Sequence, residues 1–575
     1  MKGVPVAPSE SSFSELNARL KALGESNARL TKTHEVTVAE RDAAQAERDE
    51  YKRVYVALLE AYRKLEAGLV GQKRERFVES GEQMALSALL AALVPAAVEA
   101  AAKAASTVIP EHTRAKPTGR KPLPEKLPRI HVEVLPLEVQ RAGLDAFERI
   151  GEDTCEVVER RAASLVVVRT VRPKYVAKRA ASNIAREGAV EGATAVEGVS
   201  RKVLQAAALE LPITRGLAGP GLLADTIVHR YSNHLPFYRM ERLYGREGLP
   251  LARSTICGWH EAMAELTAPL VAAMFDDARM NSPYLCVDAT GVLVLAPDKC
   301  RRGHFFVMVA PGRCVLFQYT PKHNGKAVDV LLGSYKGFLV VDAHSVYEHL
   351  FEDGCVIEVA CWAHARRYLF KALDTDKARA TYGLSLMQAL FALEREYATA
   401  TPEEKLRRRK LEAKPLIDAF FSWCDTESFK VLDETPISKA IGYARNQREA
   451  LLRFLVDGRL PIHNNHSENA LRREALGRKN WLFLGSDDGG HTNATLISLI
   501  ASCEMHKLEP LEYLRDLLCL LPSWPADRIL KLSPAHWRET TAAPSVQALL
   551  EANVYRQAAL GRLSPNPGPA IVARA

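Results

Sequence analysis

Paired cysteines and long apolar runs are both missing from this 575-residue sequence. Its ten cysteines are scattered, and no two of them form a Cys-x-x-Cys pair, which argues against a disulfide framework and favours reduced thiols in a cytoplasmic protein. The most apolar stretch, residues 85–98, is too short to span a bilayer, contains Pro95 and is followed by Glu99. Residues 1–10 lack the apolar core of a signal peptide. We therefore expect a cytoplasmic protein without a membrane partner.

The composition indicates size and charge but says little about chemistry. At 575 residues the chain is long enough for several domains, since one domain usually takes about 100–200 residues. Hydrophobic residues make up 47% of the chain, which is enough for sizeable cores. The formal charge of +8 fits a nucleic-acid partner, although many basic proteins bind no nucleic acid.

Three acids stand in places where a charge needs an explanation. Asp288 interrupts an apolar, strand-like run, and Asp342 directly follows a second one. A buried charge is costly unless it is paired or bound to a metal. Glu468 falls in the first turn of a helix predicted to begin in the polar run 464–467. The three carboxylates suit two Mg²⁺ ions, but an ordinary helical ion pair with Arg472 explains Glu468 equally well.

Six longer motifs follow one another along the chain. They are Arg-Gly-Leu-Ala-Gly-Pro-Gly-Leu-Leu at 215–223, His-Leu-Pro-Phe-Tyr-Arg at 234–239, Val-Asp-Ala-His at 341–344, Cys-Trp-Ala-His-Ala-Arg-Arg at 361–367, Asn-Asn-His-Ser-Glu-Asn-Ala-Leu-Arg-Arg at 464–473 and Gly-Arg-Lys-Asn-Trp-Leu-Phe at 477–483. In this order they make the chain resemble a DDE transposase of the insertion-sequence-sixty-six family. The resemblance extends from about residue 16 to about residue 537.

The resemblance implies a DNA transposase that binds insertion-sequence ends and catalyses metal-dependent strand cleavage and strand transfer. Asp288, Asp342 and Glu468 would be its catalytic residues and would bind two Mg²⁺ ions, which Mn²⁺ can replace. Its partners would be the double-stranded DNA of transposon ends and target, further copies of the chain, and small accessory proteins of the same element. Its place would be the bacterial cytoplasm, at the nucleoid.

The fold expected from the resemblance is an α/β RNase H-like catalytic core with a helical insertion, preceded by an N-terminal coiled coil and a small DNA-binding region. In such a core the first and fourth strands lie side by side, which would bring Asp288 and Asp342 together. The apolar runs predict core strands at residues 284–295, 304–310, 314–319, 337–341 and 356–360, with a helix near 327–332.

The chain divides into eight predicted parts. These are a coiled-coil or leucine-zipper-like segment (1–80), an Ala-rich helix with a basic, Pro-rich linker (81–131), a small domain of short strands at the family's zinc-finger position (132–212), a helical, helix-turn-helix-like DNA-binding region (213–275), the first part of the core (276–370), the helical insertion (371–460), the core's catalytic Glu helix (461–505) and a C-terminal helical tail (506–575).

The N-terminal segment carries a heptad pattern. Leucine occupies positions 16, 20, 23 and 30, and Asn27 stands in the same seam. This spacing predicts a dimerising coiled coil, in which a buried asparagine can fix the register. A helical hairpin that folds back on its own chain is the alternative.

Basic side chains in three regions are candidates for contacts with DNA phosphates. They are Arg120 and Lys121 in the linker, Arg239 and Arg253 in the helix-turn-helix-like region, and Arg472, Arg473, Arg478 and Lys479 around the Glu helix. A basic, Pro-rich arm can lie in a minor groove. The linker is equally well explained as a solvated spacer, and the helices as a plain spacer packed on the core.

Other residues that could bind a metal are expected to be structural. Family members often carry paired cysteines in the region 132–212, but here Cys155 is the only nearby cysteine. A structural zinc site needs four ligands, so we predict no zinc. Cys361 and His364 have metal-like spacing but no second pair, which favours buried packing. The role of His344, two residues after Asp342, stays open.

Composition also indicates the structure of two further segments. Asp487 and Asp488 lie in the glycine-flanked stretch 485–490, which predicts a loop. The basic run 407–410 fits either a solvated helix face or a contact with DNA ends.

Two rival functions fit the same residues. One is an RNase H-like nuclease or resolvase that cuts DNA without joining it. The other is a non-catalytic DNA-binding assembly protein, although such a protein has no need for buried acids.

Overall fold

A computed structural model describes residues 19, 21, 23–26, 123–161, 164–177, 203–297, 299–563 and 570–572. Apart from Leu23, the predicted heptad seam lies outside the described residues, as do the Ala-rich helix, Arg120 and Lys121 of the linker, and the segment 178–202. The chain divides into two compact units. One contains Met1–Lys116, Arg366–Ala389 and Leu416–Arg445, and the other contains Pro117–Ala365, Leu390–Pro415 and Asn446–Ala575.

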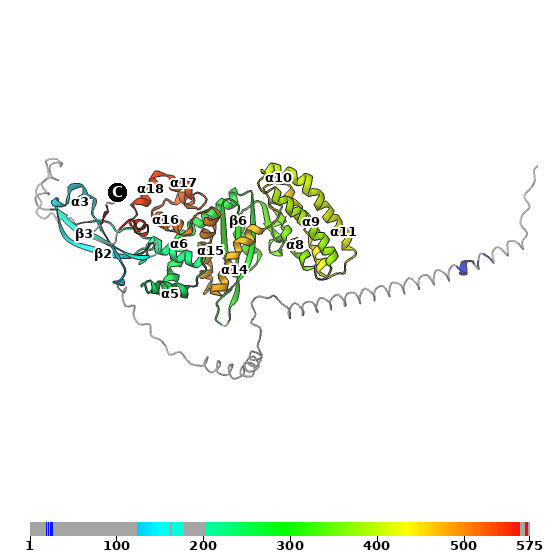
Figure 1. Ribbon diagram of the computed structural model, residues 1–575, viewed down its shortest axis with the longest axis horizontal. Coiled ribbons are helices and arrows are strands. Elements are labelled where there is room, and N and C mark those ends of the chain that lie inside the picture. Colours follow the sequence, from blue (N-terminus) through cyan, green and yellow to red (C-terminus); the bar gives the residue numbers. More distant parts are fainter. Residues whose placement is uncertain are drawn as a thin grey trace, which may run out of the picture. The chain divides into compact units, whose positions relative to one another are not determined.

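The fold is mixed α/β and mostly helical (Figure 1). Both sheets of the described chain belong to the second unit. Among the residues that the structure describes, no helix combines the length and the apolar character needed to cross a bilayer.

The first sheet is built on a long hairpin, drawn in cyan in Figure 1. Its strands β2 (Phe147–Arg161) and β3 (Ser164–Ala177) contain 15 and 14 residues, so the prediction of short strands in this region was wrong. Apolar residues of β3, such as Val166 and Val168, face a core that includes Tyr555 of helix α19 (Val554–Ala559). The remaining strands are β1 (Arg129–Val134), β4 (Leu204–Gln205) and β10 (Ala570–Val572), in the order β10-β1-β3-β2 with β4 also on β3.

The second sheet has the strand order β7-β6-β5-β8-β9. Its members are β5 (Tyr284–Val294), β6 (Arg301–Ala310), β7 (Cys314–Thr320), β8 (Gly337–Val341) and β9 (Val356–Ala360), with α7 (Gly325–Leu332) between β7 and β8. Strands β5, β6 and β7 are antiparallel neighbours, whereas β8 runs parallel to both β5 and β9. All five predicted strands, the predicted helix and the neighbouring of the first and fourth strands are confirmed.

Helix α15 (Asp487–Met505) covers the edge of this sheet. Ser498 and Ser502 accept hydrogen bonds from backbone N–H groups of β7, 2.8 and 3.0 Å long, which satisfies an otherwise open edge strand. The predicted loop at 485–490 was wrong, because α15 already begins at Asp487. Ser486 caps the helix by accepting from the Gly489 N–H at 3.0 Å, and acids in a first turn complement the helix dipole.

Three helices connect the two sheets along the chain: α4 (Pro220–Tyr231), α5 (Phe237–Arg246) and α6 (Arg253–Asn281). Helix α4 begins at a buried carboxylate, because Glu159 of β2 accepts a 2.8 Å hydrogen bond from the Leu222 N–H. A Cβ at Gly219 or Gly221 would overlap this carboxyl group. The Gly-Pro-Gly motif therefore makes room for a cap supplied by a distant strand.

The stretch after β9 is helical, as predicted. It contains α8 (Trp362–Lys371), α9 (Lys377–Glu396), α10 (Pro402–Arg408), a π-helical turn (Arg409–Ala413), α11 (Lys414–Ser428), α12 (Pro436–Asn446) and α13 (Arg448–Leu452). Within the second unit, Arg409 is fully buried and forms a bidentate ion pair with Glu394, at 2.7 and 2.8 Å. Neither a solvated face nor a DNA contact therefore explains this arginine.

The C-terminal region is also helical. It comprises α16 (Pro510–Leu520), α17 (Trp537–Ala542), α18 (Pro544–Ala552) and α19 (Val554–Ala559). The Tyr513 hydroxyl donates to the Leu532 carbonyl at 2.8 Å, and its ring packs edge-on against Trp537. This packing ties the tail into the second unit.

Candidate active site

Two of the three predicted catalytic acids lie on neighbouring strands. The parallel register of β5 and β8 pairs Tyr284 with Phe338 and Cys286 with Val340. Continued by two residues, the same register sets Asp288 opposite Asp342. The sheet thus brings together two residues that are 54 positions apart in the sequence (342 − 288).

The buried side chain of Tyr347 lies near both aspartates. Tyr347, in the 3₁₀ turn Ser345–Phe351, is 2% exposed. Burial raises the pKa of its hydroxyl well above the usual value, and the carboxylates of Asp342 and Asp288 raise it further. Two negative charges therefore face one neutral phenol.

Local backbone contacts hold the aspartate side chains. The Asp288 carboxylate accepts a 2.7 Å hydrogen bond from the Ala289 N–H, and the Asp342 carboxylate accepts a 3.3 Å bond from the His344 N–H. Between Asp342 and His344, Ala343 has a φ of 60°, in the left-handed region. This residue turns the chain sharply as it leaves β8.

The third acid is carried by a helix that is anchored beside Asp288. Helix α14 (Asn465–Trp481) holds Glu468 in its first turn, as predicted. The buried Asn464 does not cap this helix with its side chain. Its Nδ2 instead donates a 2.8 Å hydrogen bond to the carbonyl of Val287, the residue before Asp288. The Glu468 N–H donates to the Asn464 carbonyl at 3.2 Å, so Asn464 links the first turn of this helix to the strand segment that carries Asp288.

The Cys-Trp-Ala-His motif frames the start of the same helix. The Asn464 N–H lies 3.1 Å from Sγ of the buried Cys361, in agreement with the packing role predicted for this cysteine. His364 was assigned the same role, but its Nε2 lies 3.6 Å from Oε1 of Glu468. This contact could not be predicted, because the two residues are 104 positions apart in the sequence (468 − 364).

The far end of α14 is also fixed to β5. Arg478 donates a 2.8 Å hydrogen bond to the Thr290 hydroxyl and another to the Gly291 carbonyl. Beyond the helix, the N–H of Leu484 donates to the Leu293 carbonyl at 2.8 Å. The helix that bears Glu468 is therefore attached to the strand that bears Asp288 at both of its ends.

A row of histidines lies beside the aspartates. The ring centroid of His323 is 4.8 Å from that of His344 and 5.1 Å from that of His304. Burial lowers the pKa of both His304 and His323. The pKa of His304 is lowered further by His323, and the pKa of His323 is lowered further by His344. Isolated histidines at 304 and 323 carry no motif, so their grouping could not be predicted.

The donors at this site suit a hard divalent cation, because such ions prefer carboxylate oxygens. Asp288 and Asp342 supply two neighbouring carboxylates. Glu468 lies one helical turn after Asn464, the residue that is hydrogen-bonded to β5. In the described part of the chain, no three His, Cys, Asp or Glu side chains already stand together as a metal site.

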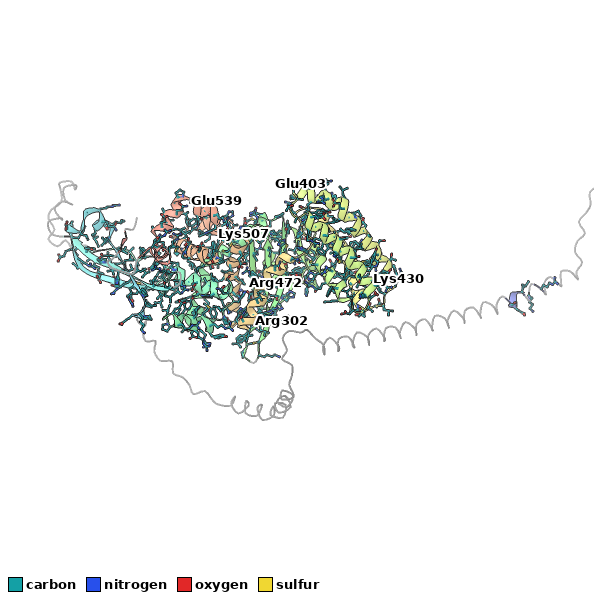
Figure 2. All side chains as sticks on the ribbon, in the orientation of Figure 1. Arg302, Glu403, Lys430, Arg472, Lys507 and Glu539 are labelled. Carbon is teal, nitrogen blue, oxygen red and sulfur yellow. The ribbon has the colours of Figure 1, made fainter. Side chains whose placement is uncertain are left out.

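Six of the basic residues proposed for DNA contact are described by the structure, and they fall into two groups. Arg239, Arg253, Arg472 and Lys479 are exposed, and Arg472 is labelled in Figure 2. Arg253 pairs with Glu241 at 3.1 Å.

The other group already has partners within the chain. Arg473 forms an ion pair with Glu504, and Arg478 donates to β5 as described above. Both side chains therefore fix α14 in its place, in addition to any role toward DNA.

Comparisons with known families cover much of the chain. A family model described as "Transposase IS66 family" matches residues 215–492. Models described as "Transposase C of IS166 homeodomain" and "IS66 C-terminal element" match residues 57–132 and 498–535. The first match contains all three acids, and the third falls on α15, α16 and the turns after them.

Relatives come from a rhizobial species. The chain is 30% identical over 443 residues to the uncharacterized protein y4qI of Sinorhizobium fredii, covering 73% of this chain and 78% of that protein. It is 28% identical over 521 residues to the uncharacterized protein y4hP of the same species, covering 85% and 90%. The similarity thus extends well beyond the core.

Proposed function

This chain belongs to the IS66 family of transposases, and from that premise we propose that it is a DNA transposase that binds insertion-sequence ends and catalyses metal-dependent strand cleavage and strand transfer. Asp288, Asp342 and Glu468 are its proposed catalytic residues. The observation that supports this most directly is the parallel pairing of β5 with β8, whose register continues to Asp288 opposite Asp342.

The core is proposed to be RNase H-like. Three antiparallel strands are followed by a helix and by two strands parallel to the first, in the spatial order β7-β6-β5-β8-β9. This arrangement agrees with the pairing of first and fourth strands that such a core requires. The helix with the third acid returns to the central strand after the helical stretch 362–455.

Each acid has its own part in the proposed chemistry. Asp288 and Asp342 would hold two divalent cations from the sheet, and Glu468 would complete their protein ligands from α14. Bound Mg²⁺ or Mn²⁺ would supply Lewis-acid stabilisation of the attacking and leaving oxygens at a DNA phosphate. His364 is a positioning residue in this proposal, because it stands 3.6 Å from Glu468 and restricts where that carboxylate points. Closing of Glu468 toward the aspartates would accompany binding of DNA.

DNA would be held through charge on the exposed side of α14 and on α5 and α6. Arg472 and Lys479 lie on the helix that carries Glu468, and Arg239 and Arg253 lie on the helix-turn-helix-like pair. Contacts of this kind position a duplex without reading its sequence. Self-association through the N-terminal segment, accessory proteins of the same element and a nucleoid location are further parts of the proposal.

The test uses purified full-length protein and DNA that carries the inverted repeats flanking its gene. The variants Asp288→Asn, Asp342→Asn and Glu468→Gln should each lower Mg²⁺-dependent end cleavage by more than about 10²-fold, as loss of a main electrostatic group does elsewhere. Binding of the ends should stay within a few-fold of wild type. Asp329→Asn, on the surface of α7 and paired with His349 at 2.7 Å, is the matched control.

The products separate the rival functions. Joining of cleaved ends to target DNA supports a transposase, whereas cleavage without joining would indicate a nuclease or resolvase. End binding without any nicking would indicate an assembly protein. Unchanged cleavage by all three variants would refute the proposed catalytic residues.

A further inference from the structure

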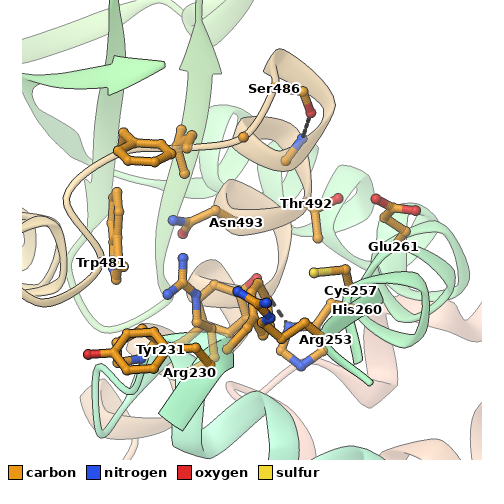
Figure 3. A pocket seen from close by; sticks show the side chains of 17 residues that line it. Arg230, Tyr231, Arg253, Cys257, His260, Glu261, Trp481, Ser486, Thr492 and Asn493 are labelled. Atoms are coloured by element: carbon orange, nitrogen blue, oxygen red, sulfur yellow. Dashed lines mark hydrogen bonds between the residues drawn. The ribbon is translucent and has the colours of Figure 1, made fainter. Parts of the chain in front are cut away.

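A cavity of about 380 Å³ lies between helices α4, α5 and α6 and the segment that joins α14 to α15 (Figure 3). Its volume falls within the range of about 300–1,000 Å³ that small-ligand sites occupy. Aromatic, basic and amide side chains line it, among them Arg230, Tyr238, Arg253, Trp481, Phe483 and Asn493. The catalytic residues proposed above do not belong to its lining.

A strained turn brings two aromatic rings to this cavity. Leu482 has φ 67° and ψ −52°, and the Phe483 N–H donates to the Trp481 carbonyl at 2.8 Å. This is a γ-turn with positive φ, a rare and strained form. It lets Trp481 and Phe483, which are nearly adjacent in the chain, both line the cavity. Strain of this kind persists where the surrounding structure imposes it, often at binding sites.

The inner wall is built from stacked, flat groups. The Arg230 guanidinium lies 4.7 Å from the ring centroid of Phe237 and 5.0 Å from that of Trp481. Trp481 in turn lies over Gly477, where a Cβ would come within 2.7 Å of the indole nitrogen. A glycine at this position is therefore needed for the tryptophan to adopt its place.

The same wall contains a buried amide, that of Asn493, which is hydrogen-bonded to Glu474 but has one unsatisfied oxygen atom. Asn493 is 2% exposed, and its Oδ1 has no hydrogen-bond partner among the described residues. Figure 3 shows its side chain projecting from α15 toward Trp481. An unsatisfied buried amide oxygen is costly, and a ligand with an N–H donor would remove that cost.

The mouth of the cavity is aromatic and positively charged. Tyr238 and Phe483 are 40% and 41% exposed, so both rings are accessible to a ligand. Arg253 stands at the rim with a side chain that is 64% exposed. Ser486 and Gly489 at the start of the 19-residue helix α15 also line the cavity, and Asp487 and Asp488 of its first turn already complement the helix dipole.

We propose that this cavity binds one unstacked nucleotide of the bound DNA, an inference that rests on the proposed transposase function. A nucleobase is flat, has a π-face for Phe483 or Tyr238, and carries N–H donors at its edge for Asn493. Its phosphate has the charge that Arg253 attracts. An apolar peptide side chain would leave the amide and the basic groups without partners.

For a DNA strand that follows the axis of α14, the helix length gives the position of that nucleotide relative to the cut. Trp481 lies 13 residues (481 − 468) beyond Glu468 on α14, which is about 20 Å along the helix axis. At about 3.4 Å for each step of a duplex strand, this equals about six nucleotides. The nucleotide in the cavity is therefore expected about five to seven positions from the cleaved phosphate.

Permanganate oxidation tests this, because it attacks a thymine from a face that no neighbouring base covers, and a base stacked on one ring keeps its other face open. End duplexes with one thymine placed at each position from three to ten are incubated with full-length protein. In complexes with wild type, we expect strong reactivity at one position within the predicted window. Phe483→Ala and Tyr238→Ala should lower that reactivity about tenfold or more, as loss of a stacking ring does. Phe429→Ala, whose ring is 86% exposed elsewhere, is the control and should leave it unchanged.

The outcomes separate this inference from the proposed function. End cleavage by wild type with no reactive thymine at any position would overturn the cavity assignment while the transposase function stands. Reactivity that persists in both aromatic variants would also overturn it. A protein that neither binds nor cleaves the ends would instead refute the proposed function.

Discussion

The side-chain amide of Asn464 donates a 2.8 Å hydrogen bond to the backbone carbonyl of Val287. This one bond joins the residue before the Glu468 helix to the residue before Asp288, across 177 positions of sequence (464 − 287). Asn464 is fully buried, so its amide cannot find water as a substitute partner. The relative position of two proposed catalytic acids thus depends on a residue that has no chemical role itself.

We therefore predict that Asn464→Ala lowers both stability and cleavage. Loss of the amide leaves the buried Val287 carbonyl without its donor, which should cost about 1–3 kcal/mol in the free energy of unfolding. Cleavage should fall further than end binding, because the helix bearing Glu468 loses its attachment to β5. Urea unfolding and single-turnover cleavage would measure the two effects.

Asn480→Ala is the matched control for this change. Asn480 is on the exposed side of the same helix, where its amide makes a 3.3 Å bond to the Leu476 carbonyl. Its loss should change the free energy of unfolding by less than about 0.5 kcal/mol. Equal effects of the two substitutions would argue against the anchoring role of Asn464.

Metal binding provides a second prediction that does not depend on activity. With the chain bound to DNA ends, added Mn²⁺ should raise the unfolding temperature of wild type, because a ligand that binds only the folded state stabilises it. Asp288→Asn and Asp342→Asn should each abolish most of this rise, since each removes one of two neighbouring carboxylates. Chelation should reverse the rise in wild type, and Asp329→Asn should retain it. A rise of equal size in both aspartate variants would contradict the site.

The strands of the core could be predicted because their signal is local. Each is a short apolar run between turn residues, and an acid inside such a run, as at Asp288, stands out without knowledge of the fold. The same is true of Glu468, which follows a polar helix start. The predictions failed where the deciding partner is distant in sequence. The stretch at 485–490 looked like a loop, but Asp487 is held by Arg301 and by the Tyr319 hydroxyl of two core strands.

Glu159 illustrates the same limit. In the sequence, Glu159 is one acid in a charged strand, and no neighbouring residue indicates that it caps a helix. Only the fold brings it to the start of α4, where Gly219 and Gly221 leave the space for it. Similarly, the grouping of His304, His323 and His344 depends on strand register and a turn, so spacing could not reveal it.

The burial of Glu159 leads to a prediction about pH. Burial raises its pKa from 4.5 to about 8, although backbone N–H groups of residues 160, 221 and 222 lower it. The folded chain therefore keeps a proton that the unfolded chain releases. The resulting stabilisation is complete below about pH 4.5 and is lost as the pH rises through about 8.

Glu159→Gln should remove this dependence, because the amide keeps the shape without the titration. Between about pH 5 and pH 8 the difference in unfolding free energy between wild type and variant should change by up to about 1.4 kcal/mol per pH unit. Wild type should lose stability relative to the variant as the pH rises. Urea unfolding at several pH values would measure this difference, and a pH-independent difference would contradict the buried proton.

The buried pair of Arg409 and Glu394 gives the last prediction. Arg409 also donates to the carbonyls of Phe454, Asp457 and Leu460, so one guanidinium satisfies several buried acceptors. Arg409→Met should cost about 3–5 kcal/mol, because it leaves Glu394 buried without its main partner. Adding Glu394→Leu should recover part of this loss but not all, since the three carbonyls still lack a donor.

The exposed neighbour Arg407 serves as the control, since its side chain is 61% exposed and pairs with Glu404 at 2.7 Å. Arg407→Met should cost at most about 1 kcal/mol, as is usual for surface ion pairs. Denaturant unfolding of the four proteins would rank them in the order wild type, Arg407→Met, double variant and Arg409→Met. If Arg409→Met were no worse than Arg407→Met, the basic run would have to act outside the folded core, for example toward DNA.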